Sequence, residues 1–449
     1  EWSYDPNPVA MLELPNRYND IFNVFGNVFA QIKLYKGLSY RVQYSFERYH
    51  DTFKDFRPVY SSTFSEDNLA NQESKYNKET QLNNNSAVTS NYQVEQRLNY
   101  NTTIGRHKLD AMVAMTYEKN SSEGINAFKR KALGNDEIYQ ILDAQTAGDN
   151  TSGGKETSSM LSYLGRINYV YDDRYLATVN FRADGSSKFN KDNRYGYFPS
   201  GSLAWSFSEE EFMKPLKSVL SSGKVRLSWG LTGNNRIGEY DYYALLAVLK
   251  SRVGSYTSTN SLPSGVYPFD NDATNAGVVP TSLPNKDLKW ETTEQWNAGL
   301  DLGFFDERIG ITMDIYRKTT RDLLLDASLP FSSGYYSATK NIGKVRNDGL
   351  ELSLNTVNFQ TRAFKWTTNF NISFNKNKVL ALSENQTALL TAAQFDQNYN
   401  GQSSYIAKVG LPMGLMYGYV YEGTYKYDDF NKSGNSYSLK PGVPHYSTE

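Results

Sequence analysis

The side chains that most often carry out catalysis or bind metals are sparse in this sequence. Its 449 residues include three histidines and no cysteine. His50, His107 and His445 lie far apart along the chain, and each falls in a predicted loop or turn. None is spaced from another as zinc ligands or a catalytic histidine and its partners usually are. We therefore interpret them as solvated loop histidines and expect neither a metal site nor a catalytic nucleophile.

Neighbouring carboxylates offer no better candidate for an active site. Asp172 and Asp173 fall in a predicted turn, and residues 209–211 are three glutamates at the start of a predicted helix. General acid and base catalysis needs carboxylates that oppose each other across a cleft. The segment Asp184-Gly185-Ser186-Ser187 lacks the spacing of a calcium-binding EF-hand loop, so a turn is the preferred interpretation. With no glycine-rich phosphate loop and no basic run, the sequence predicts no enzymatic activity, no cofactor and no nucleic-acid partner.

A second group of charged residues stands at alternate positions, opposite bulky apolar neighbours. If the strands that carry them enclose an interior, these side chains face it, and they could guide a substrate. The preferred interpretation is that they form hydrogen bonds to a domain that fills the interior, because large barrels of this kind are plugged. The group comprises Arg166, Arg182, Arg226, Asp301, Asp314, Glu351 and Lys365.

Aromatic residues in the long connections form a third group. Aromatic rings stack on sugars and grip the side chains of peptides, and they also pack against proteins. We expect these residues to bind a substrate or to contact a protein lid. They are Tyr256, Tyr267, Phe269, Tyr335, Tyr336, Phe395 and Tyr399.

The elements that must position these side chains alternate in polarity with a period of two. Between residues 161 and 213, for example, Ile167, Val179 and Leu203 belong to apolar rows, whereas Arg166 and Thr178 belong to polar rows. Successive side chains of a strand leave opposite sides of a sheet, so each strand has one apolar and one polar face. A soluble sandwich and a transmembrane barrel both fit this pattern.

About a dozen strands of this kind follow one another along the chain. Between them, short turns alternate with long polar connections at 50–90, 120–158, 233–288 and 326–344. A capping-box spacing at Ser208-Glu209-Glu210-Glu211 predicts a short helix, which Pro215 limits. The clear strands span about 21–376. We expect 377–449 to be mostly extracellular loop, with one or two further strands near 413–425.

Composition and the order of connection lengths decide between the two architectures. Lys and Arg total 47 against 48 Asp and Glu, so charge points to no partner. The mean hydropathy of −0.61 is that of a soluble protein, but alternation lowers this average in barrels too. The chain has no apolar run of roughly 20 residues, as a spanning helix would need. Regular alternation of short turns with long loops is typical of outer-membrane barrels and favours a transmembrane antiparallel β-barrel.

Four segments also resemble a known family. They are RADGSSKFNKDNRYGYFPSGSLAW, KVRLSWGLTGNNRIGEYDYYA, LPNKDLKWETTEQWNAGLDLGFFDERIGITMDIYRKTTRDLLL and NIGKVRNDGLELSLN. In this order they resemble the barrel of SusC/RagA-like TonB-dependent transporters of Bacteroidetes. Weaker similarity extends from Asn7 to Tyr425.

The resemblance implies an outer-membrane location and a 22-stranded barrel that is plugged by a separate domain. It further implies import of oligosaccharides or peptides, a SusD-like lipoprotein as partner and energy from the TonB complex. We find no signal peptide, TonB box, plug or closing strand in the sequence, and we expect 1–449 to be a central part of the barrel. Two alternatives stay open: an outer-membrane receptor or secretion-associated barrel without an import role, and a soluble β-rich binding or adhesion protein.

Overall fold

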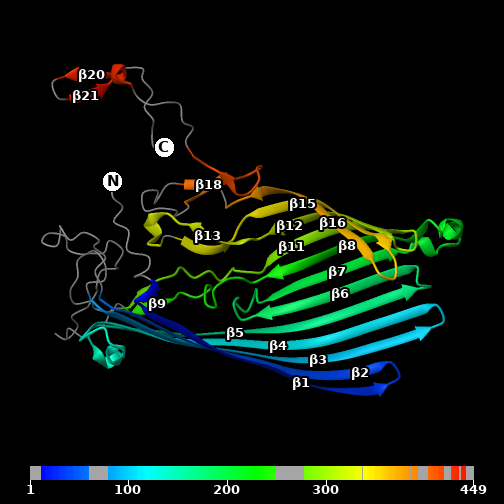
Figure 1. Cartoon of the computed structure of the whole chain (residues 1–449), viewed down its shortest axis with the longest axis horizontal. Helices are drawn as coiled ribbons and strands as arrows, with labels where there is room; N and C mark the ends of the chain where they lie inside the picture. Colours follow the sequence, from blue (N-terminus) through cyan, green and yellow to red (C-terminus); the bar gives the residue numbers. More distant parts are fainter. Residues whose placement is uncertain are drawn as a thin grey trace.

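One large antiparallel sheet dominates the structure, a computed structural model that describes residues 12–59, 79–248, 278–335, 337–383, 386–392, 403–418, 426–433 and 436–440. The sheet has twelve strands, and each lies beside the strand that precedes it in the chain, apart from small insertions (Figure 1). They are β1 (Asn16–Tyr35), β2 (Leu38–Arg57), β3 (Gln81–Ile104), β4 (His107–Ala132), β5 (Gln145–Tyr171), β6 (Tyr175–Ser186), β7 (Tyr195–Trp205), β8 (Leu220–Asn234), β11 (Glu291–Phe304), β12 (Ile309–Arg321), β15 (Lys344–Gln360) and β16 (Lys365–Ala381).

The structure also contains short strands and 3₁₀ helices outside this sheet. The strand pairs are β9 (Leu246–Val248) with β10 (Val278–Pro280), β13 (Leu324–Ser328) with β14 (Ser337–Asn341), and β20 (Phe430–Ser433) with β21 (Ser436–Leu439); β17 (Ala388–Ala392), β18 (Ser403–Lys408) and β19 (Leu415–Met416) form a three-stranded sheet. Short 3₁₀ helices are η2 (Glu137–Tyr139), η3 (Leu142–Ala144), η4 (Phe207–Glu209), η5 (Glu211–Leu216), η7 (Phe331–Ser333) and η9 (Tyr427–Asp429). No helix in the described ranges is long and apolar enough to cross a membrane.

The two ends of the sheet differ in the length of their connections, as the sequence predicts. Short turns gather at one end, on the right of Figure 1, and the long connections gather at the other. The β5–β6 turn is built on Asp172 and Asp173, which both have positive φ. Two such residues match the right-handed twist of a hairpin. We refer below to the turn end and the loop end of the sheet.

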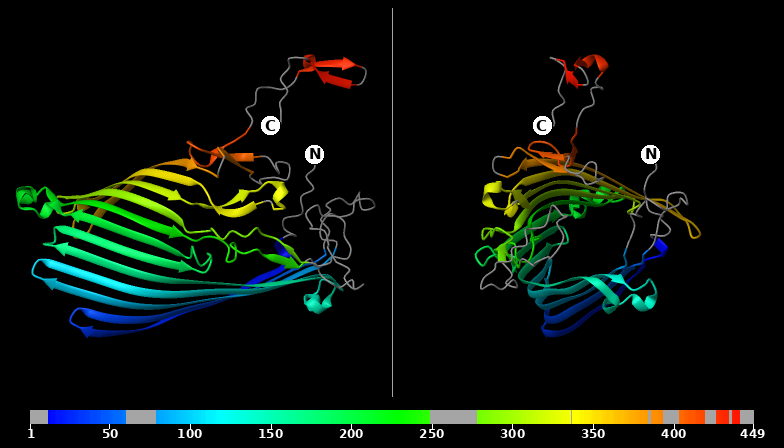
Figure 2. Two further views of the ribbon diagram at one scale, coloured as in Figure 1. Left: turned by 180° about the vertical axis from the view of Figure 1, so that it is seen from behind. Right: turned by 90° about the vertical axis from the view of Figure 1, so that its left-hand side faces the viewer.

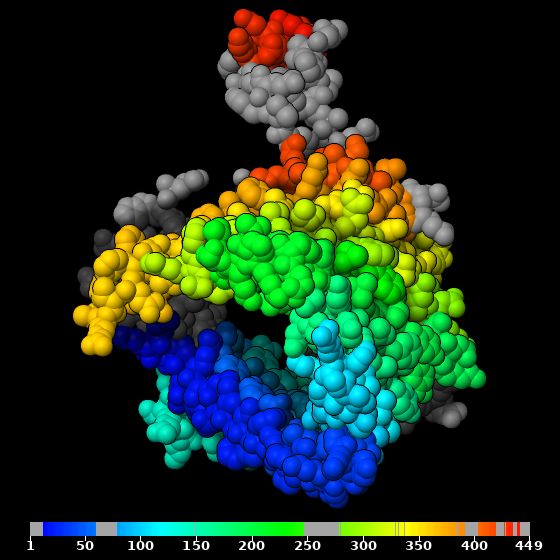
Figure 3. Space-filling view, turned by 90° about the vertical axis from the view of Figure 1, so that its right-hand side faces the viewer, coloured from blue at the N-terminus to red at the C-terminus, as the bar shows by residue number. Residues whose placement is uncertain are grey.

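The twisted sheet curls around a hollow. Seen along the strands, it bends from the N-terminal strands, drawn in blue, to the yellow and orange strands opposite them (Figure 2). The space-filling view from the turn end shows an opening between these two sides (Figure 3). The structure therefore has the form of a barrel wall, with one face turned outward and the other toward the hollow.

Several strands extend far beyond their predicted limits toward the loop end. The prediction of a loop over 50–90 was wrong in part, because β2 continues to Arg57 and β3 begins at Gln81. The predicted loop over 120–158 was wrong for the same reason, since β4 and β5 run through most of it. His50 accordingly lies in a strand rather than a loop.

The physical reason is that polar side chains occupy both faces in most of these extensions. Without apolar surroundings there is no selection for alternating polarity, so the period-two signal disappears while the ladder of backbone hydrogen bonds continues. Polar cross-strand pairs then stabilise the sheet. The hydroxyl oxygens of Thr89 and Ser122 are 3.2 Å apart, and the side-chain amide of Asn126 donates to the side-chain oxygen of Asn83 at 2.8 Å.

The predicted loop over 326–344 and the predicted capping box also differ from the structure. Residues 324–341 form the β13–β14 hairpin. From Phe207 the chain makes η4 and then η5, whose N-terminal cap is Glu210, without a side-chain capping bond. Pro215 lies inside η5 and limits it to a short helix, as expected.

Candidate functional site

The outer face of the wall carries an apolar band that no other part of the described structure covers. Ile167, Val179 and Leu203 are 52%, 61% and 63% exposed. Their side chains point to the same face of the sheet. Ile167 is paired with Val179, and Leu203 is paired with Ala177, which lies two residues from Val179 on β6 and so shares its face. A soluble sandwich would bury this face beneath a second layer. The exposed band therefore excludes the soluble sandwich and indicates contact with lipid.

Aromatic residues border this band at both ends. Trp205 and Tyr175 lie beside the turn end, and Trp229 and Trp296 lie toward the loop end with ring centroids 6.0 Å apart. On β12 the distance from Ile309 to residue 317 is about 27 Å at roughly 3.4 Å per residue. A strand tilt of about 40° from the membrane normal reduces this length to roughly 20 Å measured across the membrane. This value is close to the height of the apolar band of an outer-membrane barrel.

The inner face carries charged residues that pair with one another. The guanidinium of Arg226 on β8 donates to both carboxylate oxygens of Asp301 on β11, at 2.7 and 3.0 Å, and to Asp314 on β12 at 3.1 Å. It reaches β12 by passing over Gly299, where a Cβ atom would lie 2.6 Å from the guanidinium. A larger residue at this position would block the contact. The structure thus brings together three of the predicted inner residues in one network.

The other predicted inner residues are distributed along the same face. Arg166 donates to Asn180 at 3.0 Å, and Arg182 donates to Asp184 at 2.7 Å. Glu351 lies directly opposite Asp314 in the register of β12 and β15. Lys365 is exposed at the turn end, where β16 begins. Whether this group contacts a plug or a substrate stays a prediction.

Two further arginines on the inner face were missing from the predicted set. Arg41 and Arg97 face each other directly across β2 and β3. Arg41 donates to Gln43 at 2.7 Å and lies 3.9 Å from the ring centre of Phe29, and Arg97 forms an ion pair with Glu95 at 3.6 Å. The alternation of β2, with Arg41 between Tyr40 and Val42, was the signal that could have identified them.

Most of the predicted loop aromatics fall outside the described residues. Tyr256, Tyr267, Phe269, Tyr336, Phe395 and Tyr399 belong to this group. Tyr335 is described and is half-buried, and its backbone amide donates to the hydroxyl of Ser333 at 3.2 Å. Their proposed role in substrate binding therefore stays a prediction.

Sequence reasoning missed a small hydrophobic core at the loop end of the wall. Phe189, Phe198, Leu288 and Trp290 are buried together, and the indole of Trp290 donates to the backbone carbonyl of Arg194 at 2.9 Å. Phe198 lies opposite Arg182 in the register and so points to the inner face. The loops that contribute Phe189 and Trp290 therefore fold inward over the wall, where Ser162 and Asp184 are buried.

Polar contacts hold the neighbouring loops against this core. The ammonium group of Lys188 forms an ion pair with Glu239 at 3.2 Å and donates to the carbonyl of Ile237 at 3.0 Å. Burial and the adjacent hydroxyl of Tyr243 raise the pKa of Tyr242 to about 12. Together with Leu288 and Trp290 of the core, these residues come from three of the segments that resemble the family. The segments thus share one structural role, which is to hold the loops at this end against the inner face of the wall.

At the turn end, the β7–β8 connection folds back onto the outer face. Glu210 accepts hydrogen bonds from the hydroxyl of Tyr175 at 2.6 Å, the indole of Trp205 at 3.1 Å and the guanidinium of Arg174 at 3.1 Å. These bonds, with that of Tyr175 the largest cause, hold the pKa of Glu210 below its ordinary value of 4.5. The cluster ties β6, β7 and the β5–β6 turn to the β7–β8 connection beside the aromatic border.

The side chains that commonly bind metals do not gather in the ranges covered by the structure. There, no group of three His, Asp or Glu side chains converges as metal ligands would. His107 accepts from or donates to the hydroxyl of Tyr169 at 2.7 Å, and His50 lies 3.2 Å from the hydroxyl of Ser86. His445 lies outside the described residues.

Comparison with known proteins places this wall in a family. The family model described as TonB dependent receptor-like, beta-barrel matches residues 2–448. TonB-dependent receptor P39 of Formosa agariphila is 32% identical over 429 residues, which cover 95% of this chain and 37% of that protein. TonB-dependent receptor SusC of Bacteroides thetaiotaomicron is 36% identical over 274 residues, which cover 60% of this chain and 25% of SusC. The chain thus spans well under half the length of these relatives.

A solved structure shows the same fold. The RagAB peptide transporter matches with a TM-score of 0.74 and 22% sequence identity, over 90% of this chain and 40% of that chain. This match covers the curled antiparallel wall of the present chain, with its short turns at one end and long loops at the other. The resemblance of the four sequence segments to SusC/RagA-like proteins is therefore confirmed. This chain, with its lipid-facing band and charged inner face, belongs to the TonB dependent receptor-like β-barrel family of outer-membrane proteins.

Proposed function

We propose that the chain forms a large part of the wall of an outer-membrane importer that draws energy from the TonB complex. The observation that carries this proposal is the pairing of an uncovered apolar band with a charged inner face in a member of this family. An apolar outer face holds the wall in lipid, and a hydrophilic inner face suits a passage for polar solutes.

The proposed substrates are oligosaccharides or peptides, delivered together with a SusD-like surface lipoprotein. Two similar proteins support this proposal: SusC is a TonB-dependent receptor, and RagAB is a peptide transporter. The proposal includes no enzymatic step. The inward-folded core around Phe198 and Trp290 lies at the loop end, which is the side from which substrate and lipoprotein would approach in this proposal.

Uptake by living cells tests the import function. A strain that lacks the gene should lose uptake of at least one fluorescent oligosaccharide or peptide from a panel, and an uncoupler of the proton gradient should abolish the same uptake in the parent strain. A SusD-like lipoprotein should copurify with the protein in detergent. Unchanged uptake across the panel, with no copurifying lipoprotein, would favour a receptor or secretion-associated barrel instead.

The loop aromatics can be tested through Tyr335, the member of the group that the structure describes. We propose that its ring contacts substrate, so Tyr335→Ala should weaken uptake by about tenfold, at roughly 1 to 1.5 kcal/mol for an aromatic contact. Tyr335→Phe keeps the ring and should retain uptake. Equal uptake by the alanine variant and the parent would remove Tyr335 from the proposed site.

A further inference from the structure

The outer face changes from apolar to cationic at one level of the wall. On β8, β11, β12, β15 and β16, directly paired outer residues form a row of Leu227, Ala298, Ile315, Leu350 and Phe374. The next outward-facing row toward the loop end contains Trp229, Trp296, Arg317, Asp348 and Lys376. In a further row, Arg346 is paired with Lys378. This change occurs where the apolar band ends, at the level expected for lipid headgroups.

Positive charge exceeds negative charge in these rows. We refer to Arg317, Arg346, Lys376 and Lys378 as the cationic rim. Asp348 pairs with Arg317 at 2.6 Å and with Arg346 at 2.9 Å, so one carboxylate is shared by two guanidinium groups. Within the described ranges, neither lysine of the rim has an ion-pair partner. The rim therefore keeps an excess of positive charge that faces outward.

The surroundings of the rim do not neutralise it. The row beyond it adds Arg321 and Lys344, which are paired across β12 and β15. The other outward-facing carboxylate nearby is Glu294, which accepts a hydrogen bond from the indole of Trp229 at 3.0 Å. Six cations thus stand against Glu294 and Asp348 on this part of the outer face.

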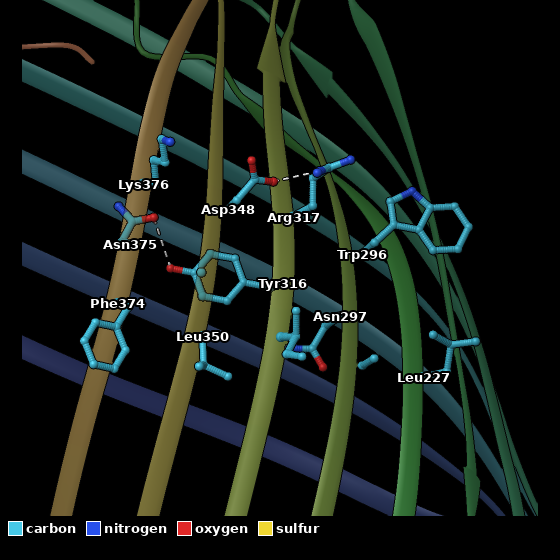
Figure 4. Close-up of a pocket in the computed structure, with 13 residues that line it drawn as sticks. Leu227, Trp296, Asn297, Tyr316, Arg317, Asp348, Leu350, Phe374, Asn375 and Lys376 are labelled. Carbon is cyan, nitrogen blue, oxygen red and sulfur yellow. Dashed lines mark hydrogen bonds and ion pairs between the residues drawn. The ribbon is translucent and has the colours of Figure 1, made fainter. Parts of the chain in front are cut away.

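A groove joins the cationic rim to the apolar band. It has a volume of about 760 Å³ and is lined by residues of both rows, including Trp296, Arg317, Lys376, Leu350 and Phe374. Figure 4 shows Trp296, Arg317, Asp348 and Lys376 along one level and Leu227, Leu350 and Phe374 along the next. One end of the groove is therefore cationic and the other end is apolar, which matches an amphiphile with an anionic head.

Fewer cations face outward on the N-terminal side of the wall. On β2 to β5, three successive outer rows, from the row of Phe46 to the row of His50, contain Arg48, Lys119 and Lys155 against Glu123. Scattered lysines that extend to the membrane surface would be distributed evenly around the wall. The six cations on β12, β15 and β16 are twice as many as these three.

We propose that the cationic rim and its groove bind the phosphate-bearing headgroup of a membrane lipid in the leaflet at the loop end. Arg317 and Arg346 offer N–H donors to phosphate oxygens, Lys376 and Lys378 add charge, and Trp296 and Phe374 contact the upper acyl chain. The occupant is a lipid because the groove is continuous with the lipid-facing band. This site is separate from the proposed passage, since it lies on the opposite face of the sheet.

Native mass spectrometry of the full-length protein tests this site. The protein in detergent is mixed with equal amounts of phosphatidic acid and phosphatidylcholine that have the same acyl chains. The parent should retain phosphatidic acid in preference to phosphatidylcholine by roughly tenfold or more. Lys376→Gln combined with Lys378→Gln should remove most of that preference while leaving the Arg317–Asp348 pair intact. Lys376→Arg with Lys378→Arg should keep it.

Lys119→Gln is the matched control, because it removes one outward-facing cation of the wall that lies away from the rim. It should retain the preference for phosphatidic acid. The ratio of retained phosphatidic acid to phosphatidylcholine is measured on the folded protein, so it does not depend on how much folded protein each variant gives. The proposal is overturned if the double glutamine variant keeps the full preference, if Lys119→Gln loses as much, or if inorganic phosphate at the same concentration displaces the lipid.

Discussion

At the scale of single residues, two neighbours in one strand of this wall have different surroundings. Val179 is on the lipid-facing side of β6, whereas Thr178 is on the inner side, where its hydroxyl donates to Asn168 at 3.0 Å. The backbone alternates its side chains between the two faces, so adjacent positions meet lipid and interior in turn. The same substitution should therefore have very different costs at the two positions.

Val179→Arg should lower the free energy of unfolding by about 2 to 4 kcal/mol, because an arginine near the middle of the apolar band must be desolvated or must distort the lipid around it. Thr178→Arg should cost less, since its side chain extends into a polar interior. Denaturant unfolding of the full-length protein in lipid vesicles measures both. Equal losses at the two positions would contradict the assignment of the faces.

Arg226→Gln should also destabilise the protein, by about 1 to 3 kcal/mol, because it leaves the carboxylates of Asp301 and Asp314 without their shared cation. The three side chains are 32%, 34% and 18% exposed, so solvent weakens the effect below that of a fully buried pair. The double variant Arg226→Gln with Asp301→Asn should recover part of the loss. Arg166→Gln serves as the control, because Arg166 donates to the neutral side chain of Asn180. A double variant that adds both single losses in full would show that the network is not coupled.

At the scale of elements, alternating polarity identifies a strand only where the two faces have different surroundings. The hairpin of β1 and β2 was predicted from Leu38, Tyr40 and Val42, which alternate with Ser39 and Arg41. The loop-end halves of β3 and β4 were missed because polar side chains occupy both faces there. Sequence reasoning therefore identified the membrane-spanning part of each strand and not its extension.

The β7–β8 connection should respond to pH through Glu210. Its pKa lies below 4.5 in the folded protein, so its hydrogen bonds contribute stability above that value and lose it as the pH falls through the lowered pKa. Hydrogen exchange, expressed as protection factors for residues 206–220, should show weaker protection below pH 4.5 than at pH 7. Glu210→Gln should remove this difference. A difference of the same size in the variant would assign the pH response to another group.

The inward-folded core at the loop end should depend on Trp290. Trp290→Ala removes a 7% exposed ring and its hydrogen bond to Arg194, and such changes cost about 3 to 5 kcal/mol in the unit they stabilise. We expect protease cleavage between residues 235 and 248 to become much faster while the β1–β5 part of the wall keeps its resistance. Tyr335→Ala, an aromatic residue outside this core, is the control. Unchanged cleavage would show that the loops are held by other contacts.

At the scale of the whole molecule, the apolar band and the charged inner face act together. The band requires lipid, because so large an exposed apolar surface is not stable in water. The protein should therefore stay with the membrane pellet after an alkaline carbonate wash and enter solution when detergent is added. Release by carbonate alone would contradict the assignment of this band to lipid.

The sequence alone determined which residues face lipid and which face the interior, because that division follows from a local period of two along each strand. It also predicted the order of short turns and long loops, and the motifs identified the family. Only the tertiary structure decided which charges meet. Arg226 and Asp314 are 88 positions apart and touch across Gly299, and Phe189 meets Trp290 only when loops fold inward. These contacts depend on how strands pair in register and how the sheet curls, which no local pattern specifies.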